Sequence, residues 1–369
     1  MALSEPVTYK STNSGGDERL AYAASAMQGY RVQMEDAHVT MLQLHAATQT
    51  SFFAVYDGHG GPAVAKFCQK HLHAELLKHE EFQTNLPNAL QSTFLRMDVL
   101  LRDKKAAKEL CKHGGNEQWK KYKRDRLIGF VMPCQKPAYE GPVGDGCTAC
   151  VALIRGNHII VANAGDSRCV LSRKGQATDL SRDHKPNVPA ETQRIEHAGH
   201  NVTVTAEKGN VPRIDEGIAI ARAIGDLGYK DNTALTAEEQ AVTAFPDVRT
   251  EEINDDAEFM IIACDGIWDC MTSQEVVDYV RLYLNKNNTL SYICESLLQH
   301  CVLQPRGRDN MSVVLVRFKN NPVTPESPPD VVLPRDIRST PPNFVAEETP
   351  ECSANRAKKS EIQSATTDF

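Results

Sequence analysis

The apolar positions of the chain recur with two different periods, and each period predicts one kind of element. Apolar residues are spaced as in a helix in residues 62–79, 86–101 and 290–302. A further helix is expected after Thr272, because Thr272 and Glu275 have the spacing of a capping box in front of the apolar pattern VVDYVRLYL. The sequence therefore predicts helices in both halves of the chain.

Short runs of apolar and β-branched residues predict strands between these helices. The runs occupy residues 21–26, 39–42, 51–56, 148–154, 158–162, 168–171, 259–264 and 311–318. Several of them follow one another with only a short turn between, such as the turn at residues 155–157. Strands joined in this way pair in antiparallel fashion, so we expect an α+β protein with antiparallel sheets and helices packed outside them.

Three segments depart from this alternation. Residues 1–19 contain no apolar run, and we expect a flexible N-terminal segment there. Residues 320–369 hold eight of the 19 prolines and few large apolar side chains, which is typical of a disordered tail. Residues 102–143 begin with a basic stretch and are expected to be an insertion within one domain of residues 20–319.

The basic stretch and the tail each allow two interpretations. In residues 102–126, Lys and Arg number ten and Asp and Glu four, and Trp119 and Tyr122 lie among them. This stretch is either a patch for an anionic partner or nuclear import, or, as we favour, a solvated helix end followed by a loop, so nucleic acid is not an expected partner. In the tail, proline follows four hydroxyl residues, which suggests a proline-directed kinase as a partner, although any Pro/Ser/Thr-rich linker contains such pairs: Thr324, Ser327, Thr340 and Thr349.

Composition narrows the class of protein without naming a partner. With 41% hydrophobic residues, 24% charged residues and a net charge of −7, the chain resembles an ordinary globular protein, and we expect a monomer. No apolar run approaches about 18 residues, and the N-terminus lacks the apolar core of a signal peptide, so we expect a cytoplasmic or nuclear protein with no membrane contact. The 11 cysteines are expected to be core thiols, because Cys147 and Cys150 have no second pair of ligands at zinc spacing.

Aspartate recurs where the predicted strands end. Asp57 follows FFAVY, Asp166 follows IIVANAG, Asp265 follows FMIIAC, and Asp309 stands just before MSVVLVRF. One aspartate at a strand end usually only starts a turn. If four of them meet, carboxylates about 4 Å apart repel by about 4 kcal/mol per pair at an effective dielectric constant of 20. Such a cluster requires cations, and because all the ligands are oxygens we expect Mg²⁺ or Mn²⁺.

The residues beside this cluster suggest further chemistry. Gly58 has no Cβ, so its carbonyl could approach an ion closely. His59 is either a packed side chain or a proton donor, since an ordinary histidine pKa of about 6.5 suits acid–base work near neutrality. Arg31 lies four residues before Glu35, a spacing that fits a surface ion pair or, beside metal ions, a clamp for phosphate.

Eight stretches of the sequence, taken in order, resemble the metal-dependent protein phosphatases of the protein phosphatase 2C family. The resemblance extends from about Leu20 to Phe318, and only residues 102–143 are longer than the usual core of the family. It implies a central sandwich of two antiparallel β-sheets flanked by helices, in α/β/β/α layers. The matching stretches are GYRVQMEDAH, FFAVYDGHGG, GCTACVALI, VANAGDSRCVL, RDHKP, ARAIGD, ACDGIWD and RDNMSVVLV.

The resemblance also implies a two-metal centre that holds Mg²⁺ or Mn²⁺. At the matching positions, Asp57 is expected to bridge both ions, and the Gly58 carbonyl to bind the first. Glu35, Asp265 and Asp309 are expected to complete the shell of the second ion. The implied reaction is hydrolysis of phosphoserine and phosphothreonine in phosphoprotein substrates by a metal-activated water.

The remaining matched residues are expected to act around this centre. Arg31 is expected to grip the substrate phosphate and His59 to protonate the departing serine or threonine oxygen. Asp166 and Asp269 match positions that hold a weaker third metal in some members of the family, and Asp226 matches a position at the edge of the active site. A non-catalytic phosphoprotein-binding scaffold that uses the same pocket is the alternative to an enzyme.

Overall fold

The strands expected from the apolar runs assemble into two large antiparallel sheets. The computed structural model describes residues 2–114, 139, 141–206 and 209–319, and all of them belong to one compact unit. The six-stranded sheet contains, in spatial order, β1 (Ala2–Gly16), β2 (Leu20–Arg31), β16 (Met311–Phe318), β15 (Ala257–Ala263), β9 (Arg168–Arg173) and β10 (Gln176–Asp179). The five-stranded sheet contains β14 (Asp247–Glu252), β8 (His158–Ala164), β7 (Ala149–Arg155), β4 (Thr50–Tyr56) and β3 (Ala37–His45).

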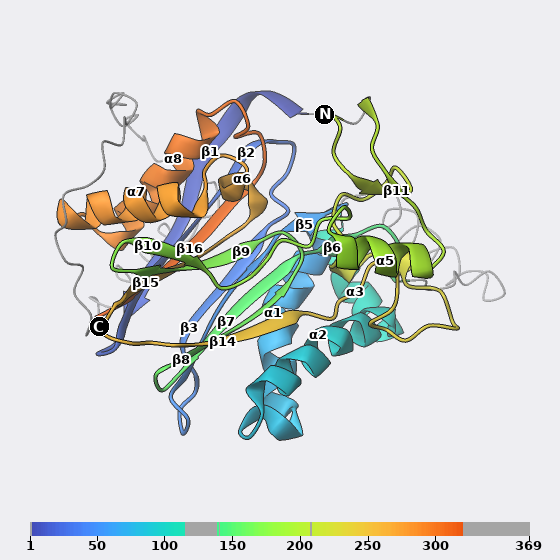
Figure 1. The fold of residues 1–369 in the computed structure, drawn as a ribbon, viewed down its shortest axis with the longest axis horizontal. Helices are drawn as coiled ribbons and strands as arrows, with labels where there is room; N and C mark the ends of the chain where they lie inside the picture. The colour runs from blue at the N-terminus through green and yellow to red at the C-terminus, as the bar shows by residue number, and fades with distance from the viewer. Residues whose placement is uncertain (1, 115–138, 140, 207–208, 320–369) are drawn as a thin grey trace, which may run out of the picture. The chain divides into compact units, whose positions relative to one another are not determined.

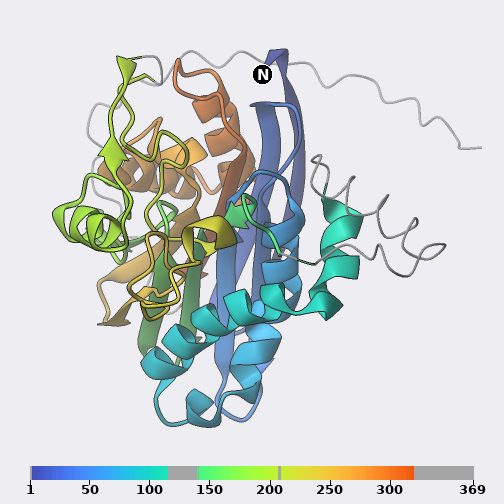
Figure 2. The ribbon, with the colours of Figure 1, turned by 90° about the vertical axis from the view of Figure 1, so that its right-hand side faces the viewer.

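Helices cover the outer face of each sheet (Figure 1). On the five-stranded sheet lie α1 (Ala63–Lys78), α2 (Leu86–Arg102) and α3 (Lys104–His113), which face the viewer in Figure 2. On the six-stranded sheet lie α7 (Ser273–Asn285) and α8 (Leu290–Val302). The expected α+β sandwich with flanking helices is therefore confirmed. The other described helices are η1 (Glu80–Phe82), α5 (Pro189–His197), η4 (Leu227–Tyr229) and α6 (Asp265–Trp268).

Strand β4 shows why its sequence is a continuous apolar run. Phe53 and Val55 pack into the core between the two sheets, and Phe52, Ala54 and Tyr56 pack against the helices. Because both faces of the strand are buried, no position alternates to a polar residue. Full burial of a side chain as large as Phe or Val stabilises the fold by about 1.5–3 kcal/mol, so β4 is a rigid support for the residue that follows it.

The predicted helices agree closely with the observed ones. The helix expected in residues 290–302 has the bounds of α8, and α7 begins directly after Thr272. The expected capping box is present: Thr272 Oγ1 accepts a hydrogen bond from the Glu275 amide, and the Glu275 carboxylate accepts one from the Thr272 amide. The polar helix α5 was not predicted, because it carries few apolar side chains at helical spacing. α3 lies in the basic stretch, where a solvated helix end was the favoured interpretation.

The expectation of a flexible N-terminal segment is wrong. Residues 2–16 form β1, an edge strand that pairs with β2 from Ala2 opposite Arg31 to Gly16 opposite Ala21. Its side chains are mostly exposed, so the strand is held by backbone hydrogen bonds that a hydropathy pattern does not reveal. Pro6 lies where the register between the two strands shifts, a position at which an edge strand tolerates proline.

Two small sheets complete the architecture. One contains β13 (Ile224–Gly225), β6 (Gly146–Cys147) and β5 (Gly58–His59), and it follows the end of β4. The other pairs β11 (Val202–Thr203) with β12 (Arg213–Ile214). Most of the basic insertion and the whole tail lie outside the described residues. Among the helices that are described, none has both the length and the hydropathy needed to span a membrane.

Candidate active site

Three strands end at the same place, and an aspartate follows each of them. β4 ends directly before Asp57, and β8 and β15 end two residues before Asp166 and Asp265. One ligand oxygen from each of the three carboxylates lies within 4.8 Å of those of the other two. The structure therefore brings together carboxylates from distant parts of the chain, at one end of the sandwich.

The electrostatics of this cluster are unfavourable in the absence of a cation. Burial, and then the charges of Asp36 and Asp265, raise the pKa of Asp57 well above its usual range. Burial and the charge of Asp166 do the same to the pKa of Asp265. Each carboxylate is thus harder to ionise because its neighbours carry the same charge. Such a site favours a bound cation.

Asp36 belongs to this site, although the sequence reasoning gave it no role. It is buried, and one of its oxygens accepts a hydrogen bond of 2.7 Å from Ser312 Oγ. Its other oxygen, Oδ1, is buried without a hydrogen-bond partner in the described part of the chain. Asp36 also forms a close group with Asp57 and Cys264, and burial raises the pKa of Asp36 to about 7. The signal was its position directly after Glu35 within a matching stretch.

Glu35 and Asp309 lie beside the cluster and share one arginine. Arg31 Nη2 lies 3.1 Å from Glu35 Oε2, and Arg31 Nε lies 3.2 Å from Asp309 Oδ1. The Arg31 side chain is 42% exposed, so the guanidinium stands at the mouth of the site and not in the core. Asn310 anchors the loop between β2 and β3, because its Oδ1 accepts a hydrogen bond of 2.9 Å from the Glu35 amide.

The backbone at Gly58 passes very close to this loop. A Cβ at Gly58 would lie 2.3 Å from the carbonyl oxygen of Glu35, so any larger residue would force the two segments apart. Gly58 pairs with Cys147 in the small sheet of β5 and β6. The amide of Asp57 in turn lies 3.3 Å from Thr148 Oγ1, its acceptor. Both contacts fix the direction in which Asp57 leaves β4.

The small sheet also places His59 against Asp226. His59 lies opposite Gly146, which lies opposite Gly225, and Asp226 is the next residue. The His59 Nε2 atom is 2.7 Å from Asp226 Oδ2. Burial alone would lower the pKa of His59, but the charge and hydrogen bond of Asp226 outweigh burial and raise it. The pair therefore favours a protonated imidazole beside the carboxylate cluster.

Lys185 is a second residue that the sequence reasoning missed. It forms an ion pair with Asp166, and its charge also acts on Asp265 and Asp269. Burial would lower the pKa of Lys185, but the Asp166 carboxylate outweighs burial and raises it. Burial raises the pKa of Asp269 in spite of this lysine. Lys185 lies in the RDHKP stretch, whose spacing carries no sign of the contact.

The donor set fits a hard divalent cation. The group of Asp57, Asp166 and Asp265 offers only oxygen ligands and an excess of negative charge, which is the chemistry that Mg²⁺ and Mn²⁺ prefer. The orphaned Oδ1 of Asp36 adds a buried acceptor next to this group. All nine cysteines in the described residues are free thiols, and Cys147 lies 3.6 Å from Cys68 and not in a zinc-like set.

Solved structures share this fold. A phosphatase from a pathogenic strain of Toxoplasma gondii is 25% identical to this chain, with a TM-score of 0.65 over 85% of this chain and 96% of that one. A serine-threonine phosphatase 2C from Toxoplasma gondii is 19% identical, with a TM-score of 0.63 over 84% of this chain and 99% of that one. The fold and the acidic site thus define a protein phosphatase of the α+β sandwich class.

Sequence relatives identify the family. The family model described as "Protein phosphatase 2C" matches residues 20–119 and 135–311, which is more than half of the chain. A probable protein phosphatase 2C 42 from Oryza sativa subsp. japonica is 55% identical over 86% of this chain and 89% of that protein. A probable protein phosphatase 2C 21 from Arabidopsis thaliana is 41% identical over 89% of this chain and 95% of that protein. The chain belongs to the protein phosphatase 2C family of serine/threonine phosphatases, as its motifs predicted.

Proposed function

We propose that this enzyme hydrolyses phosphoserine and phosphothreonine in phosphoprotein substrates with Mg²⁺ or Mn²⁺ bound, two ions per domain and a weaker third. The observation that carries the proposal is the approach of Asp57, Asp166 and Asp265 to within 4.8 Å of one another in a buried, oxygen-only group. When bound, the ions supply a water nucleophile of lowered pKa and neutralise charge on the phosphoryl oxygens.

The residues that would hold the ions have distinct environments. Asp57 and Asp265 lie at the centre of the cluster and are the strongest candidates for ligands, with the Gly58 carbonyl beside them. Glu35 and Asp309 complete the set of ligands beside the cluster, and without ions Arg31 forms an ion pair with each of them. Each of these side chains follows or precedes a strand of the sandwich, so the ligand set is preorganised by rigid elements.

Arg31 binds the substrate phosphate in this proposal. Its guanidinium is half exposed at the mouth of the site, and its planar set of donors matches two phosphoryl oxygens at once. When no substrate is bound, Glu35 and Asp309 orient the guanidinium through contacts of 3.1 Å and 3.2 Å. Because the transition state of phosphoryl transfer is loose, most of the acceleration comes from such positioning and charge neutralisation.

His59 supplies the proton for the leaving oxygen. Asp226 accepts a hydrogen bond from His59 Nε2 and stabilises the charged imidazolium. The Nδ1 atom of His59 is then left to donate to the departing serine or threonine oxygen. A positioned general acid contributes about 10²–10⁴-fold to the rate of a reaction with a poor leaving group. The buried carboxylate of Asp226 raises the pKa of His59 and thus keeps the imidazole protonated to higher pH than an unpaired histidine.

One experiment separates this enzyme from the non-catalytic scaffold. Purified protein is incubated with Mn²⁺ and a phosphothreonine peptide, and released phosphate is measured for the wild-type protein and for the Asp57→Asn variant. The proposal predicts multiple turnovers by the wild-type protein and none above background by the variant. Tight binding of the peptide without release of phosphate would establish the scaffold instead.

The finer statements on partners and location stay predictions. A cytoplasmic or nuclear location, a monomeric state and a proline-directed kinase that acts on the tail rest on sequence patterns alone. The residues that carry the kinase prediction, and Trp119 and Tyr122 of the basic stretch, lie outside the described residues. Phosphate labelling of the full chain by a proline-directed kinase, compared with a variant in which all four tail sites are alanine, tests the kinase prediction.

A further inference from the structure

A buried ion pair of Asp98 and Lys230 contacts the backbone next to Asp226, the partner of His59. Asp98, on α2, is 8% exposed, and its Oδ2 accepts a hydrogen bond of 2.6 Å from Lys230 Nζ. Its Oδ1 accepts a second hydrogen bond of 2.8 Å from the amide of Gly225, the neighbour of Asp226. One carboxylate on a rigid helix therefore touches the segment that carries Asp226 at two points.

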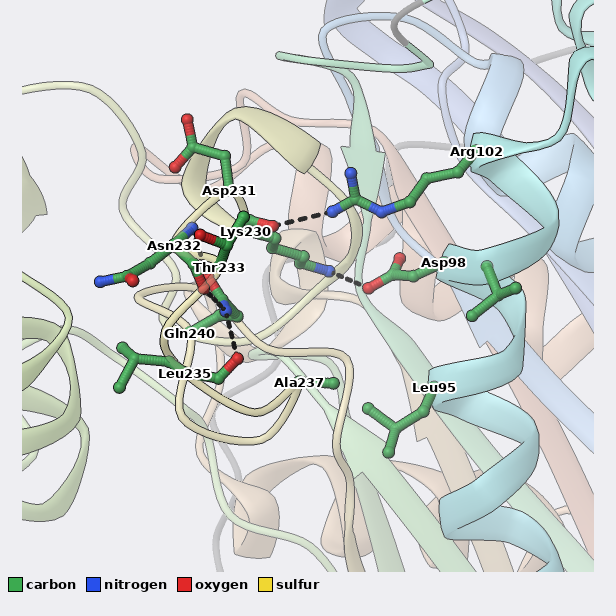
Figure 3. A pocket seen from close by; sticks show the side chains of 11 residues that line it. Leu95, Asp98, Arg102, Lys230, Asp231, Asn232, Thr233, Leu235, Ala237 and Gln240 are labelled. Atoms are coloured by element: carbon green, nitrogen blue, oxygen red, sulfur yellow. Dashed lines mark hydrogen bonds and ion pairs between the residues drawn. The ribbon is translucent and has the colours of Figure 1, made fainter.

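Lys230 also forms a hydrogen bond within the segment that carries Asp226. It is 7% exposed, and Nζ also donates to the carbonyl oxygen of Ala223 at 2.6 Å. The carbonyl oxygen of Lys230 accepts a hydrogen bond of 2.8 Å from Arg102 Nη2 on α2, as Figure 3 shows. Residues 223–230, which contain β13 and η4, thus form a loop whose two ends are joined by the lysine and tied to α2.

This loop requires an external restraint. Asp226 has a φ of 48°, in the left-handed region, although it is not a glycine. A residue held there costs about 1–3 kcal/mol and persists only where the surroundings determine its conformation. Backbone hydrogen bonds help to hold this conformation, because the Asp226 amide donates to the Asp145 carbonyl oxygen and the Tyr229 amide donates to that of Asp226. The conformation also directs the Asp226 carboxylate, whose Oδ2 lies 2.7 Å from His59 Nε2.

Ile224 and Leu227 are buried and help to hold this loop, but apolar packing is incomplete around Lys230. A cavity of about 520 Å³ separates α2 from residues 231–240, with Leu95 and Val99 on one wall and Leu235 and Ala237 on the other. Figure 3 shows the Asp98 and Lys230 side chains meeting across this gap. A buried ion pair is a weak source of stability, because desolvation offsets most of its attraction. The contacts of this pair instead restrict the geometry of the loop.

We propose that Asp98 and Lys230 are positioning residues for the proton donor, which act by holding Asp226 in line with His59. This inference rests on the proposed phosphatase mechanism, in which His59 protonates the leaving oxygen. It assigns the pair no contact with substrate or metal. Its distinctive consequence is that the pair matters only for substrates whose leaving group requires a proton.

The test compares two substrates in the Lys230→Met variant. A phosphothreonine peptide has a poor leaving group, and p-nitrophenyl phosphate has a good one that leaves without help from an acid. Because a general acid contributes about 10²–10⁴-fold, partial misalignment is expected to lower kcat for the peptide about 10-fold or more. The kcat for p-nitrophenyl phosphate and the affinity for Mn²⁺, measured by calorimetry, are expected to stay as in the wild-type protein.

Two controls make the result specific. Lys70→Met makes the same change in an exposed ion pair with Glu109 and is expected to leave both substrates unaffected. His59→Gln combined with Lys230→Met is expected to be no slower on the peptide than His59→Gln alone, because both changes remove the same proton transfer. If Lys230→Met does not fold, Asp98→Leu combined with Lys230→Met removes both charges and leaves no unpaired ion.

The outcomes are distinct. A selective loss on the peptide supports the proposal. An equal loss on both substrates in a folded variant assigns the pair a structural role only, and no loss on either substrate removes any link to His59; both results overturn the proposal. If the wild-type protein turns over neither substrate with Mn²⁺ present, the proposed phosphatase function itself has failed, which is a different result from any of these.

Discussion

The Nε2 atom of His59 lies 2.7 Å from Oδ2 of Asp226, although 167 positions separate the two residues in the sequence. Gly146 is on β6, between β5, which ends at His59, and β13, which ends directly before Asp226. A Cβ built on Gly146 would be 2.1 Å from Asp226 Oδ2 and 2.7 Å from His59 Nε2. The hydrogen bond therefore exists only because residue 146 has no side chain. Its geometry is as much a property of this glycine as of the two residues it joins.

Substitution of Gly146 by alanine is expected to separate the pair and slow the release of phosphate from a phosphothreonine peptide by about 10-fold or more, as loss of an aligned general acid would. Gly144→Ala is the matched control, because a Cβ at residue 144 meets nothing within 4 Å. Initial rates at saturating peptide and Mn²⁺ test this directly. Equal rates for the two variants would show that the contact has no role in turnover.

Asp226→Asn is expected to shift the pH dependence of peptide hydrolysis. His59 must be protonated to donate, and the Asp226 carboxylate raises the pKa of His59, so the wild-type protein keeps the donor charged to higher pH. The neutral asparagine removes this charge, and the decline of kcat on the alkaline side is expected to begin at lower pH. The exposed Asp231→Asn serves as control. A decline at unchanged pH would mean that Asp226 does not set this ionisation.

The metal-free protein is expected to lose stability as the pH rises. Folding raises the pKa of Asp36 to about 7 and the pKa of Asp57 well above its usual range, so the folded state binds more protons than the unfolded state, where aspartate has a pKa of about 4. The free energy of unfolding therefore falls as pH rises from about 4 through these values. Thermal melts of chelator-treated protein at a series of pH values measure the trend.

Asp57→Asn provides the control for these melts. It removes one buried charge from the cluster, so the variant is expected to be more stable than the wild-type protein without metal, and less sensitive to pH between about 5 and 7. Glu191, whose pKa is lowered by Arg222 in spite of burial, is ionised in both states in this window and does not reverse the trend. A wild-type protein whose stability rises toward neutral pH after chelation would contradict the account of the cluster.

Lys185→Met is expected to tighten the binding of the weakest Mn²⁺ ion several-fold. The ammonium group neutralises Asp166 and acts on Asp265 and Asp269, so it competes with a cation at that side of the cluster. Lys185→Arg keeps the charge and is expected to bind Mn²⁺ as the wild-type protein does. Electron paramagnetic resonance counts free Mn²⁺ during a titration. Weaker binding by the methionine variant would show that Lys185 supports the site.

The fold could be predicted from sequence wherever burial alone shapes the pattern. β4 was visible because both of its faces are buried, α7 because its capping box and apolar stripe agree, and α8 because of its apolar stripe. β1 was not, because an edge strand with exposed side chains is held by its backbone, and a polar sequence is equally typical of a flexible segment. Hydropathy reports side-chain burial and not backbone pairing.

The same limit applies to the site. Asp57, Asp166 and Asp265 could be predicted to meet because each follows a strand. The contact of Lys185 with Asp166 and the pair of Asp98 and Lys230 depend on how loops fold back onto the sandwich, which no local spacing encodes. The one available sign was Asp98 itself, a charged residue within the apolar stripe of α2.

The central claim is that these carboxylates meet in order to hold divalent ions, and a calorimetric titration of chelator-treated protein with Mn²⁺ tests it most directly. The account predicts that the wild-type protein binds at least two ions per chain, that Asp57→Asn abolishes this binding, and that peptide phosphatase activity returns in step with occupancy. Phosphatase activity that persists undiminished in the metal-free protein, or an Asp57→Asn titration that superimposes on that of the wild-type protein, would contradict it.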